Sequence, residues 1–145
     1  MPFPCSFCND ANAGGFAKAW HFDHKENSIY LSLNNTVGGS ILLNNTICHG
    51  ENQRSGEFGH MTLVPEGELC YCGKRGCVDP YCSASLLSNS TDGSLERFFQ
   101  LLRELVALHN TFEQDGSYLH ICQYRLEATA VDAALQYIEE FLRSV

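Results

Sequence analysis

Three cysteines with metal-ligand spacing lie within eight residues of one another, at Cys70, Cys72 and Cys77. Two glycines between the last two allow the backbone to turn tightly, so that three sulfur atoms can converge. A closed tetrahedral zinc site needs a fourth ligand, and His60 is the best-placed candidate upstream. The sequence therefore predicts a structural zinc ion on His60, Cys70, Cys72 and Cys77; the alternative is three free thiols in a turn.

The other cysteines give weaker signals. Cys5 and Cys8 have C-x-x-C spacing, which favours two core cysteines on a short buried strand, with a metal or redox pair as the alternatives. Cys48, Cys82 and Cys122 stand alone, and we expect small, buried apolar side chains there. Eight cysteines can indicate disulfides in a secreted protein, but the N-terminus shows no signal-peptide pattern. The clustering therefore favours metal binding.

Three carboxylates stand where either chemistry or solvation would explain them. Asp10 precedes an apolar run, so it is either a helix cap or a general base. Glu57 lies between two nearby glycines, and no helix explains it; it is a solvated loop carboxylate or a ligand contact. Asp79 follows the last cysteine of the cluster, on the rim of the expected metal site.

The elements that must position these residues alternate between helix and strand. A helix is expected from the Asn9–Asp10 region to Trp20, and turn-rich sequence then joins short apolar runs into a β-meander. The predicted strands are Ser28–Leu33, Ser40–Leu43, Thr46–Cys48 and Met61–Val64. Residues Pro65–Cys82 are too rich in Gly and Cys for a regular element, so a bound ion would have to hold them.

The second half of the sequence is expected to be scaffold. A polar break at Ser88–Gly93 precedes an apolar stripe of helical period from Ser94 to His109. A strand over Tyr118–Tyr124 and an amphipathic helix over Glu127–Leu142 complete the prediction.

Composition limits the possible functions. The 145 residues suffice for one domain, and the net charge of −8 disfavours direct nucleic-acid binding, which needs clustered Lys and Arg. No apolar run approaches the roughly 18 residues of a membrane span. We therefore expect a cytoplasmic domain without membrane contact.

The motifs together resemble the ROK family, which joins repressors, open reading frames and sugar kinases. The segment Gly56–His60, followed after nine residues by Cys-x-Cys-Gly-x-x-Gly-Cys, is similar to the family signature. Asn9–Ala13 resembles its catalytic Asn-Asp motif, and Ile29–Gly50 its phosphate-loop hairpin. The resemblance implies an α/β, partial actin-like ATPase (ribonuclease H-like) fold, with a mixed sheet, flanking helices and a zinc-bound loop. One domain, 1–145, would contain a sugar and zinc part, 1–86, and a helical C-terminal part, 87–145.

The resemblance also implies roles for single residues. Asn9, Glu57 and His60 would hydrogen-bond sugar hydroxyls, and Asp10 would be the catalytic base of an active enzyme. One ring nitrogen of His60 would bind zinc, leaving the other for the sugar. Asp79 stands where the family usually has Glu, and would give a longer or water-mediated sugar contact. Cofactor binding would fall to Gly38 and Gly39 of a degenerate phosphate loop.

Three departures argue against phosphoryl transfer. Asn34–Thr36 replaces a Gly-Thr-Gly stretch, and its side chains would crowd a phosphate. The family's N-terminal lobe is expected to be missing before Asn9, and Ser94–Gly116 is short for an adenosine cradle. ATP and Mg²⁺ are therefore not expected to bind well.

The favoured function is the non-catalytic, ligand-sensing part of a transcriptional regulator similar to the N-acetylglucosamine and xylose repressors. Its ligand would be a hexose or N-acetylhexosamine, its metal a structural zinc, and homo-oligomers remain open. The alternatives are an ATP-dependent sugar kinase, glucokinase- or fructokinase-like, or a fragment of one, and a zinc-stabilised module that only binds partners.

Overall fold

The computed structural model describes residues 9–20, 27–82, 84–112 and 116–122, and six isolated positions from Ala130 to Leu142. All six of these positions are helical, in agreement with the helix predicted over Glu127–Leu142. The rest of that helix lies outside the described residues, as do Cys5 and Cys8. No helix in the described ranges has the length and apolar character needed to cross a membrane.

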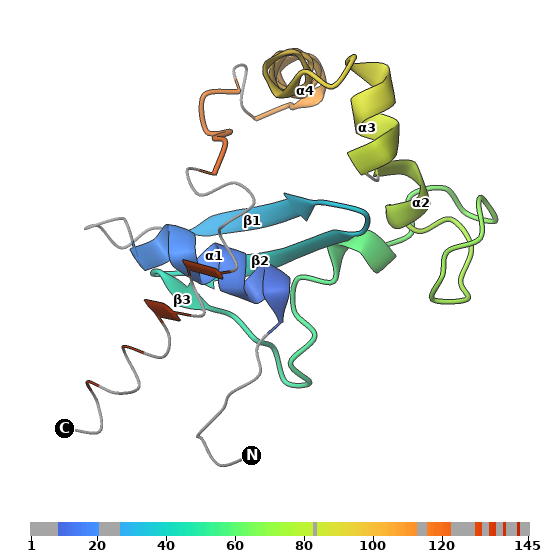
Figure 1. The fold of residues 1–145 in the computed structure, drawn as a ribbon. Coiled ribbons are helices and arrows are strands. Elements are labelled where there is room, and N and C mark those ends of the chain that lie inside the picture. The colour runs from blue at the N-terminus through green and yellow to red at the C-terminus, as the bar shows by residue number, and fades with distance from the viewer. Residues whose placement is uncertain are drawn as a thin grey trace.

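A three-stranded sheet forms the centre of the described structure (Figure 1). Its strands are β1 (Ser28–Leu33), β2 (Val37–Leu43) and β3 (Thr46–Ile47), in the order β1-β2-β3. Both pairings are antiparallel, so the described strands do not form the mixed sheet that was predicted. The second strand begins at Val37, three residues before the predicted start, because Gly38 and Gly39 also pair with β1.

Helix α1 (Asp10–Trp20) packs against the sheet through small residues. A Cβ atom on Gly15 would lie 1.9 Å from Ser40 Oγ, and one on Gly38 would lie 2.9 Å from the Ala11 Cβ. The helix can approach β2 this closely only because side chains are absent at these positions. Behind the contact, Leu42 and Ile47 form the buried core.

The cap of α1 differs from the prediction. Asn9, rather than Asp10, occupies the N-cap position, and its Oδ1 accepts hydrogen bonds from the Ala11 and Asn12 N–H groups at 2.9 and 3.1 Å. Asp10 lies in the first turn, where its Oδ1 also accepts from the Ala11 N–H at 2.8 Å. The helix begins at Asp10, one residue earlier than an Asp10 cap would require, so the cap moves to the preceding side chain.

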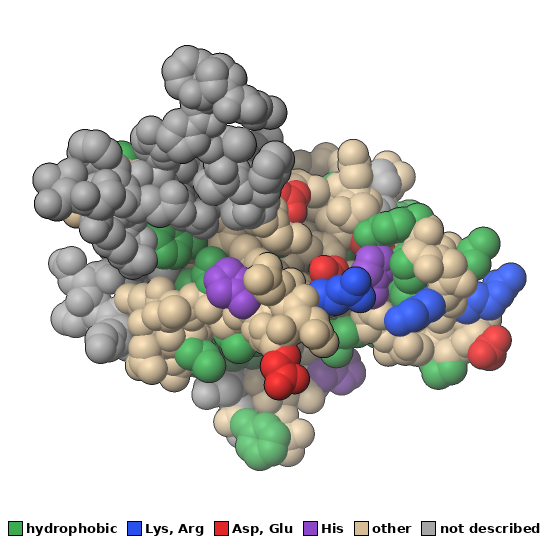
Figure 2. Space-filling view, turned by 90° about the horizontal axis from the view of Figure 1, so that it is seen from below, with side chains coloured by type: hydrophobic (Ala, Val, Ile, Leu, Met, Phe, Trp, Pro, Cys, Tyr) green, Lys and Arg blue, Asp and Glu red, His purple; other side chains and the backbone are tan. Residues whose placement is uncertain are grey.

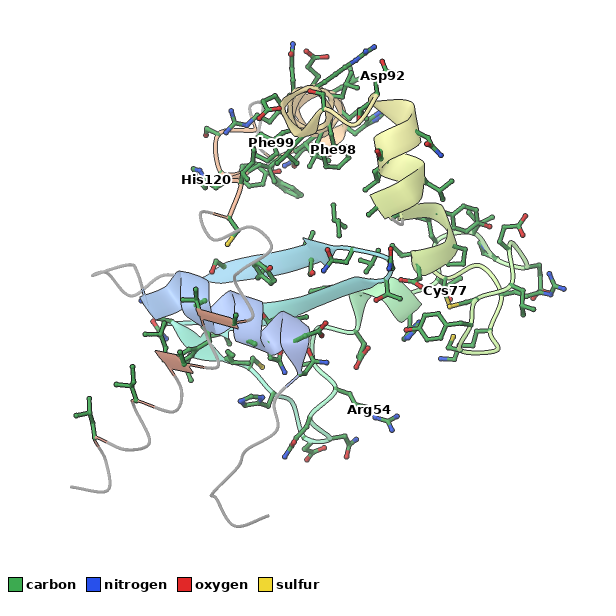
Figure 3. The ribbon with its side chains drawn as sticks, in the orientation of Figure 1. Arg54, Cys77, Asp92, Phe98, Phe99 and His120 are labelled. Carbon is green, nitrogen blue, oxygen red and sulfur yellow. The ribbon has the colours of Figure 1, made fainter. Side chains whose placement is uncertain are left out.

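Helices α2 (Asp79–Cys82), α3 (Ala84–Ser90) and α4 (Leu95–His109) follow the cysteine-rich loop. The predicted polar break is therefore shorter than expected, since α3 continues to Ser90. Ser94 caps α4 by accepting a hydrogen bond from the Arg97 N–H at 3.2 Å, as an N-cap serine does. Figure 3 shows Phe98 and Phe99 projecting from α4 toward the side on which the sheet lies.

Residues 118–122 do not form the predicted strand. The Leu119 carbonyl oxygen accepts a hydrogen bond from Arg103 Nη2 at 2.8 Å, and the Arg103 guanidinium also stacks 4.7 Å from the centre of the Phe99 ring. The Arg103 side chain of α4 thus donates to a backbone carbonyl that would pair with a neighbouring strand if these residues formed one. Alternating apolar residues alone could not reveal this.

Candidate functional site

The cysteine-rich loop folds back on itself with little regular structure. Two isolated bridges, Thr62–Cys77 and Leu69–Arg75, replace the strand that was predicted over Met61–Val64. Gly76 has a φ of 78°, and a Cβ atom there would lie 1.7 Å from the Val64 carbonyl oxygen. The turn is thus open only to glycine, and it brings Cys77 back beside the start of the loop.

The four predicted ligands converge. The candidate ligand atoms of His60, Cys70, Cys72 and Cys77 all lie within 4.8 Å of one another. The His60 Nδ1–Cys70 Sγ distance is 3.7 Å, and the Cys72 Sγ–Cys77 Sγ distance is 3.8 Å. Tetrahedral bonds of about 2.0 Å to nitrogen and 2.3 Å to sulfur place neighbouring ligand atoms about 3.5–3.8 Å apart. The cluster could therefore hold a metal ion; in Figure 3, Cys77 lies next to α2.

The thiols of this cluster differ in acidity. The Lys74 backbone N–H hydrogen-bonds to the Cys72 sulfur and lowers its pKa. Burial, together with the neighbouring thiols of Cys72 and Cys70, raises the pKa of Cys77 to about 11. Cys72 is exposed whereas Cys77 is buried, so Cys72 ionises more readily than Cys77.

His60 ends a short 3₁₀ turn, η1 (Phe58–His60), that lies against β2. A Cβ atom on Gly59 would lie 2.3 Å from the Val37 carbonyl oxygen, so this close contact depends on glycine. The second ring nitrogen of His60, Nε2, lies 3.0 Å from the Tyr71 hydroxyl oxygen. Residue types and spacing alone do not predict this partner.

A cleft of about 150 Å³ opens beside the cluster. Four segments line it: the N-terminal end of α1, the β1–β2 turn with the start of β2, the loop from Gln53 to Glu57, and Tyr71 of the cysteine-rich loop. The cleft brings together the predicted Asn9, Asp10, Glu57, Gly38 and Gly39.

The two remaining predicted contacts do not line the cleft. His60 is not among the described lining residues, but its Nε2 lies 3.0 Å from the hydroxyl oxygen of Tyr71, which does line the cleft. Asp79 is buried, with 6% of its surface exposed, and its Oδ1 accepts a hydrogen bond from the Val37 N–H at 2.6 Å. This bond ties the first residue of α2 to the first residue of β2, and the sugar contact of Asp79 stays a prediction.

Gly38 and Gly39 have a packing role besides any role toward a cofactor. Gly38 accommodates Ala11 of α1, and a Cβ atom on Gly39 would lie 2.4 Å from the Phe58 ring. Both glycines are therefore explained by the approach of neighbouring elements. Their presence alone does not indicate a phosphate.

Four lining residues that sequence reasoning missed carry polar side chains: Asn12, Gln53, Ser55 and Tyr71. Asn12 is 9% exposed, and its Oδ1 has no hydrogen-bond partner in the described part of the chain. Its position three residues after Asn9, on the same side of α1, is the signal that could have found it. The place of Tyr71 between two cysteines could not have been connected with the cleft before the fold was known.

The β1–β2 turn is held by backbone hydrogen bonds within the turn and to α3. The Asn34 N–H donates to the Thr36 carbonyl oxygen at 3.1 Å, and the Asn34 carbonyl oxygen accepts from the Ala84 N–H at 2.7 Å. The second bond joins the turn to the start of α3. Residues 34–36 are thereby fixed at the end of the hairpin, with Thr36 on the cleft.

Charge on the described surface is dispersed. Figure 2 shows the Lys and Arg side chains of one face interspersed with apolar and acidic ones. In the cleft itself, the charged lining groups are Asp10 and Glu57, both carboxylates. Hydrogen-bond donors such as sugar hydroxyls suit these groups better than anions do.

Comparison with known proteins gives a consistent family assignment. Residues 1–137 match the family model described as ROK family. Glucokinase of Halalkalibacterium halodurans is 39% identical over 92 residues, which cover 61% of this chain and 28% of the relative. N-acetylmannosamine kinase of Yersinia pestis (strain Pestoides F) is 34% identical over 91 residues, covering 62% and 31%. The chain thus spans about a third of the length of these relatives.

Solved structures agree. A ROK family glucokinase from Streptomyces griseus, crystallised with glucose and AMPPNP, superposes with a TM-score of 0.51 at 28% identity. The match covers 70% of this chain and 39% of that one.

Proposed function

Since this chain belongs to the ROK family, we propose that its cleft binds a monosaccharide, a hexose or an N-acetylhexosamine, beside a structural zinc ion. The observation that carries the proposal is the convergence of Asn9 and Asp10 with Glu57 on one cleft, next to the His/Cys cluster. Two of the relatives are named for glucose and N-acetylmannosamine, the two ligand classes proposed.

The chemistry of the lining suits a polyol. The carboxylates of Asp10 and Glu57 can accept hydrogen bonds from hydroxyl groups, and such charge-assisted bonds are stronger than neutral ones. Asn12 adds a buried acceptor that lacks a partner, which a bound hydroxyl or water could supply. In the presence of a phosphoryl donor, Asp10 would be the group placed to take the hydroxyl proton.

Zinc is the proposed metal because three thiolates and an imidazole are one of its usual structural ligand sets. His60, Cys70, Cys72 and Cys77 would hold it and thereby fix the irregular loop 61–78. A metal on Nδ1 of His60 would also fix the tautomer of the ring, so that Nε2 carries the proton.

For the whole protein we propose ligand sensing without catalysis, as in repressor-type regulators. The support is the β1–β2 turn, in which Asn34 and Thr36 stand in place of glycines and the Asn34 carbonyl is engaged by Ala84. A sugar kinase is the second candidate, and the names of the relatives favour it. Sugar binding is common to both.

A sugar panel with two variants tests the site. Glucose, N-acetylglucosamine and N-acetylmannosamine are titrated by calorimetry into zinc-loaded protein. Glu57→Gln keeps the side-chain shape but removes the acceptor charge, so it should weaken sugar binding and leave the zinc content unchanged. His60→Ala should reduce both, because the residue serves the metal and supports the cleft.

Two results would decide against the proposal. If neither variant changes the binding of a sugar that the wild type binds, the sugar site lies elsewhere. If no sugar in the panel binds at all, the zinc-stabilised module without a sugar becomes the better account.

A further inference from the structure

Tyr71 connects the metal cluster with the cleft. It stands between two candidate metal ligands, Cys70 and Cys72, so a bound metal fixes its backbone on both sides. Its side chain is 72% exposed and lines the cleft. The rings of Tyr71 and His60 meet edge to face, with their centres 5.1 Å apart.

The hydrogen bond between these two rings has a preferred direction. Nδ1 of His60 lies 3.7 Å from Cys70 Sγ, so Nδ1 is the nitrogen on the side of the cluster. With a metal on Nδ1, Nε2 carries the proton and donates it to the Tyr71 hydroxyl oxygen, 3.0 Å away. The proton of the Tyr71 hydroxyl is then free to be donated to another group.

The proton of the Tyr71 hydroxyl can serve as a hydrogen-bond donor in the cleft. The charged groups among the described lining residues, Asp10 and Glu57, are acceptors. The donors in that part of the lining are therefore neutral groups, and the Tyr71 hydroxyl is one of them besides amides such as Asn9. A sugar oxygen also needs a donor for its lone pairs. In the described structure, His60 does not line the cleft, whereas Tyr71 does.

We propose that Tyr71 is a specificity-determining residue of the cleft. Its hydroxyl takes the place of His60 as the hydrogen-bond donor to one oxygen of the sugar, a hydroxyl or an acetamido carbonyl. The inference rests on the proposed function, because it assumes that the cleft binds a sugar. Its consequence is selection for a neutral pyranose with an acceptor at the position that faces Tyr71.

The test is a set of double-mutant cycles between the protein and the ligand. The sugar of the panel that binds most tightly and its monodeoxy derivatives are titrated into wild-type and Tyr71→Phe protein, both loaded with zinc. Tyr71→Phe should weaken the parent sugar by about three- to tenfold, the effect of one neutral hydrogen bond. One deoxy sugar, which lacks the facing oxygen, should bind both proteins equally well.

Tyr81→Phe is the matched control. The Tyr81 hydroxyl, from α2, accepts a hydrogen bond from the Glu68 N–H at 2.7 Å, so this variant loses a hydroxyl that contacts the same loop. Tyr81 does not line the cleft. It should leave the order of the sugars and the coupling pattern as in the wild type.

Several outcomes would overturn the inference. Tyr71 does not contact the sugar if Tyr71→Phe binds the parent sugar as well as or better than the wild type. The same holds if every deoxy sugar loses affinity by the same factor in both proteins. Loss of zinc from Tyr71→Phe but not from Tyr81→Phe would show a structural role instead. If Glu57→Gln weakens binding and Tyr71→Phe does not, only this inference fails; if the wild type binds no sugar, the proposed function fails with it.

Discussion

At the scale of residues, we expect the order of the loop 61–78 to depend on four candidate metal ligands, one histidine and three cysteines. Their ligand atoms lie within 4.8 Å of one another, while the loop between them has two isolated bridges and several backbone hydrogen bonds. A bound metal, as proposed, would supply much of the order of such a loop, because the free energy of binding is also free energy of folding. Two predictions belong to this scale.

The first prediction concerns the metal ligands. Cys72→Ser should remove about one zinc per chain and lower the free energy of unfolding by several kcal/mol, as the loss of a structural metal does. Metal analysis and urea denaturation measure the two effects. Cys48→Ser, a half-buried thiol outside the cluster, is the control and should keep its zinc. Wild-type protein purified without chelators and found free of zinc would refute the site.

The second prediction concerns pH. Burial raises the pKa of Cys77 from its usual 9.0 to about 11, so the metal-free fold binds this proton more tightly than the unfolded chain. The stability contributed by this group is present below pH 9 and is lost as the pH rises toward 11. A metal instead requires the thiolate, so zinc affinity should rise with pH, by about tenfold per pH unit for each proton released.

Competition with a fluorescent chelator between pH 6 and 8 measures the affinity, and denaturation of the metal-free protein between pH 8 and 11 measures the stability. The two trends should have opposite signs. An affinity that does not change with pH would show that the thiols are not ligands.

At the scale of elements, the site depends on contacts between segments far apart in the sequence. Glycines allow α1 and η1 to lie directly on β2, and Asp79 joins α2 to the start of the same strand. The strand β2 therefore positions both sides of the cleft. A change at one of these junctions should alter stability without removing a ligand contact.

The third prediction tests the junction at Asp79. Asp79→Ala leaves the Val37 N–H without its partner in a buried place, which should cost about 1–3 kcal/mol of unfolding free energy. Asp79→Asn retains an acceptor oxygen and should cost clearly less. Urea denaturation of zinc-saturated protein measures both. Equal midpoints for the two variants would mean that the hydrogen bond contributes nothing.

At the scale of the whole molecule, the two proposals differ in whether the domain phosphorylates the proposed sugar or only binds it. The chain spans 28% and 31% of two kinase relatives, so their full activity cannot be transferred to it directly. In the described part, the segment that resembles a phosphate loop is the β1–β2 turn. Its residues 34–36 stand where the family has a Gly-Thr-Gly stretch.

The fourth prediction follows from that turn. ATP with Mg²⁺ should give no measurable binding in calorimetry at micromolar concentrations, because close backbone approach to phosphates needs glycine. The sugar that binds most tightly in the panel serves as the positive control. Micromolar ATP affinity, or hydrolysis of ATP that depends on a hexose, would replace the sensor proposal with the kinase.

The sequence by itself determined what depends on local spacing. The convergence of His60 with the three cysteines follows from short-range turns at glycines, and α1 and α4 follow from helical periodicity and capping residues. The family resemblance was confirmed by the match over residues 1–137. The roles of Asn9, Asp10 and Glu57 stay proposals, although the cleft does bring them together.

Tertiary structure alone decided the contacts between distant segments. Asp79 accepts a hydrogen bond from the Val37 N–H, Arg103 donates to the Leu119 carbonyl that the predicted strand needed, and the Tyr71 hydroxyl lies beside His60 Nε2. A hydrogen bond of this kind depends on where two elements pack, and neither residue type nor spacing carries that information. For the same reason, the sequence could not show that Gly38 and Gly39 also accommodate Ala11 and Phe58, and their role toward a phosphate stays a prediction.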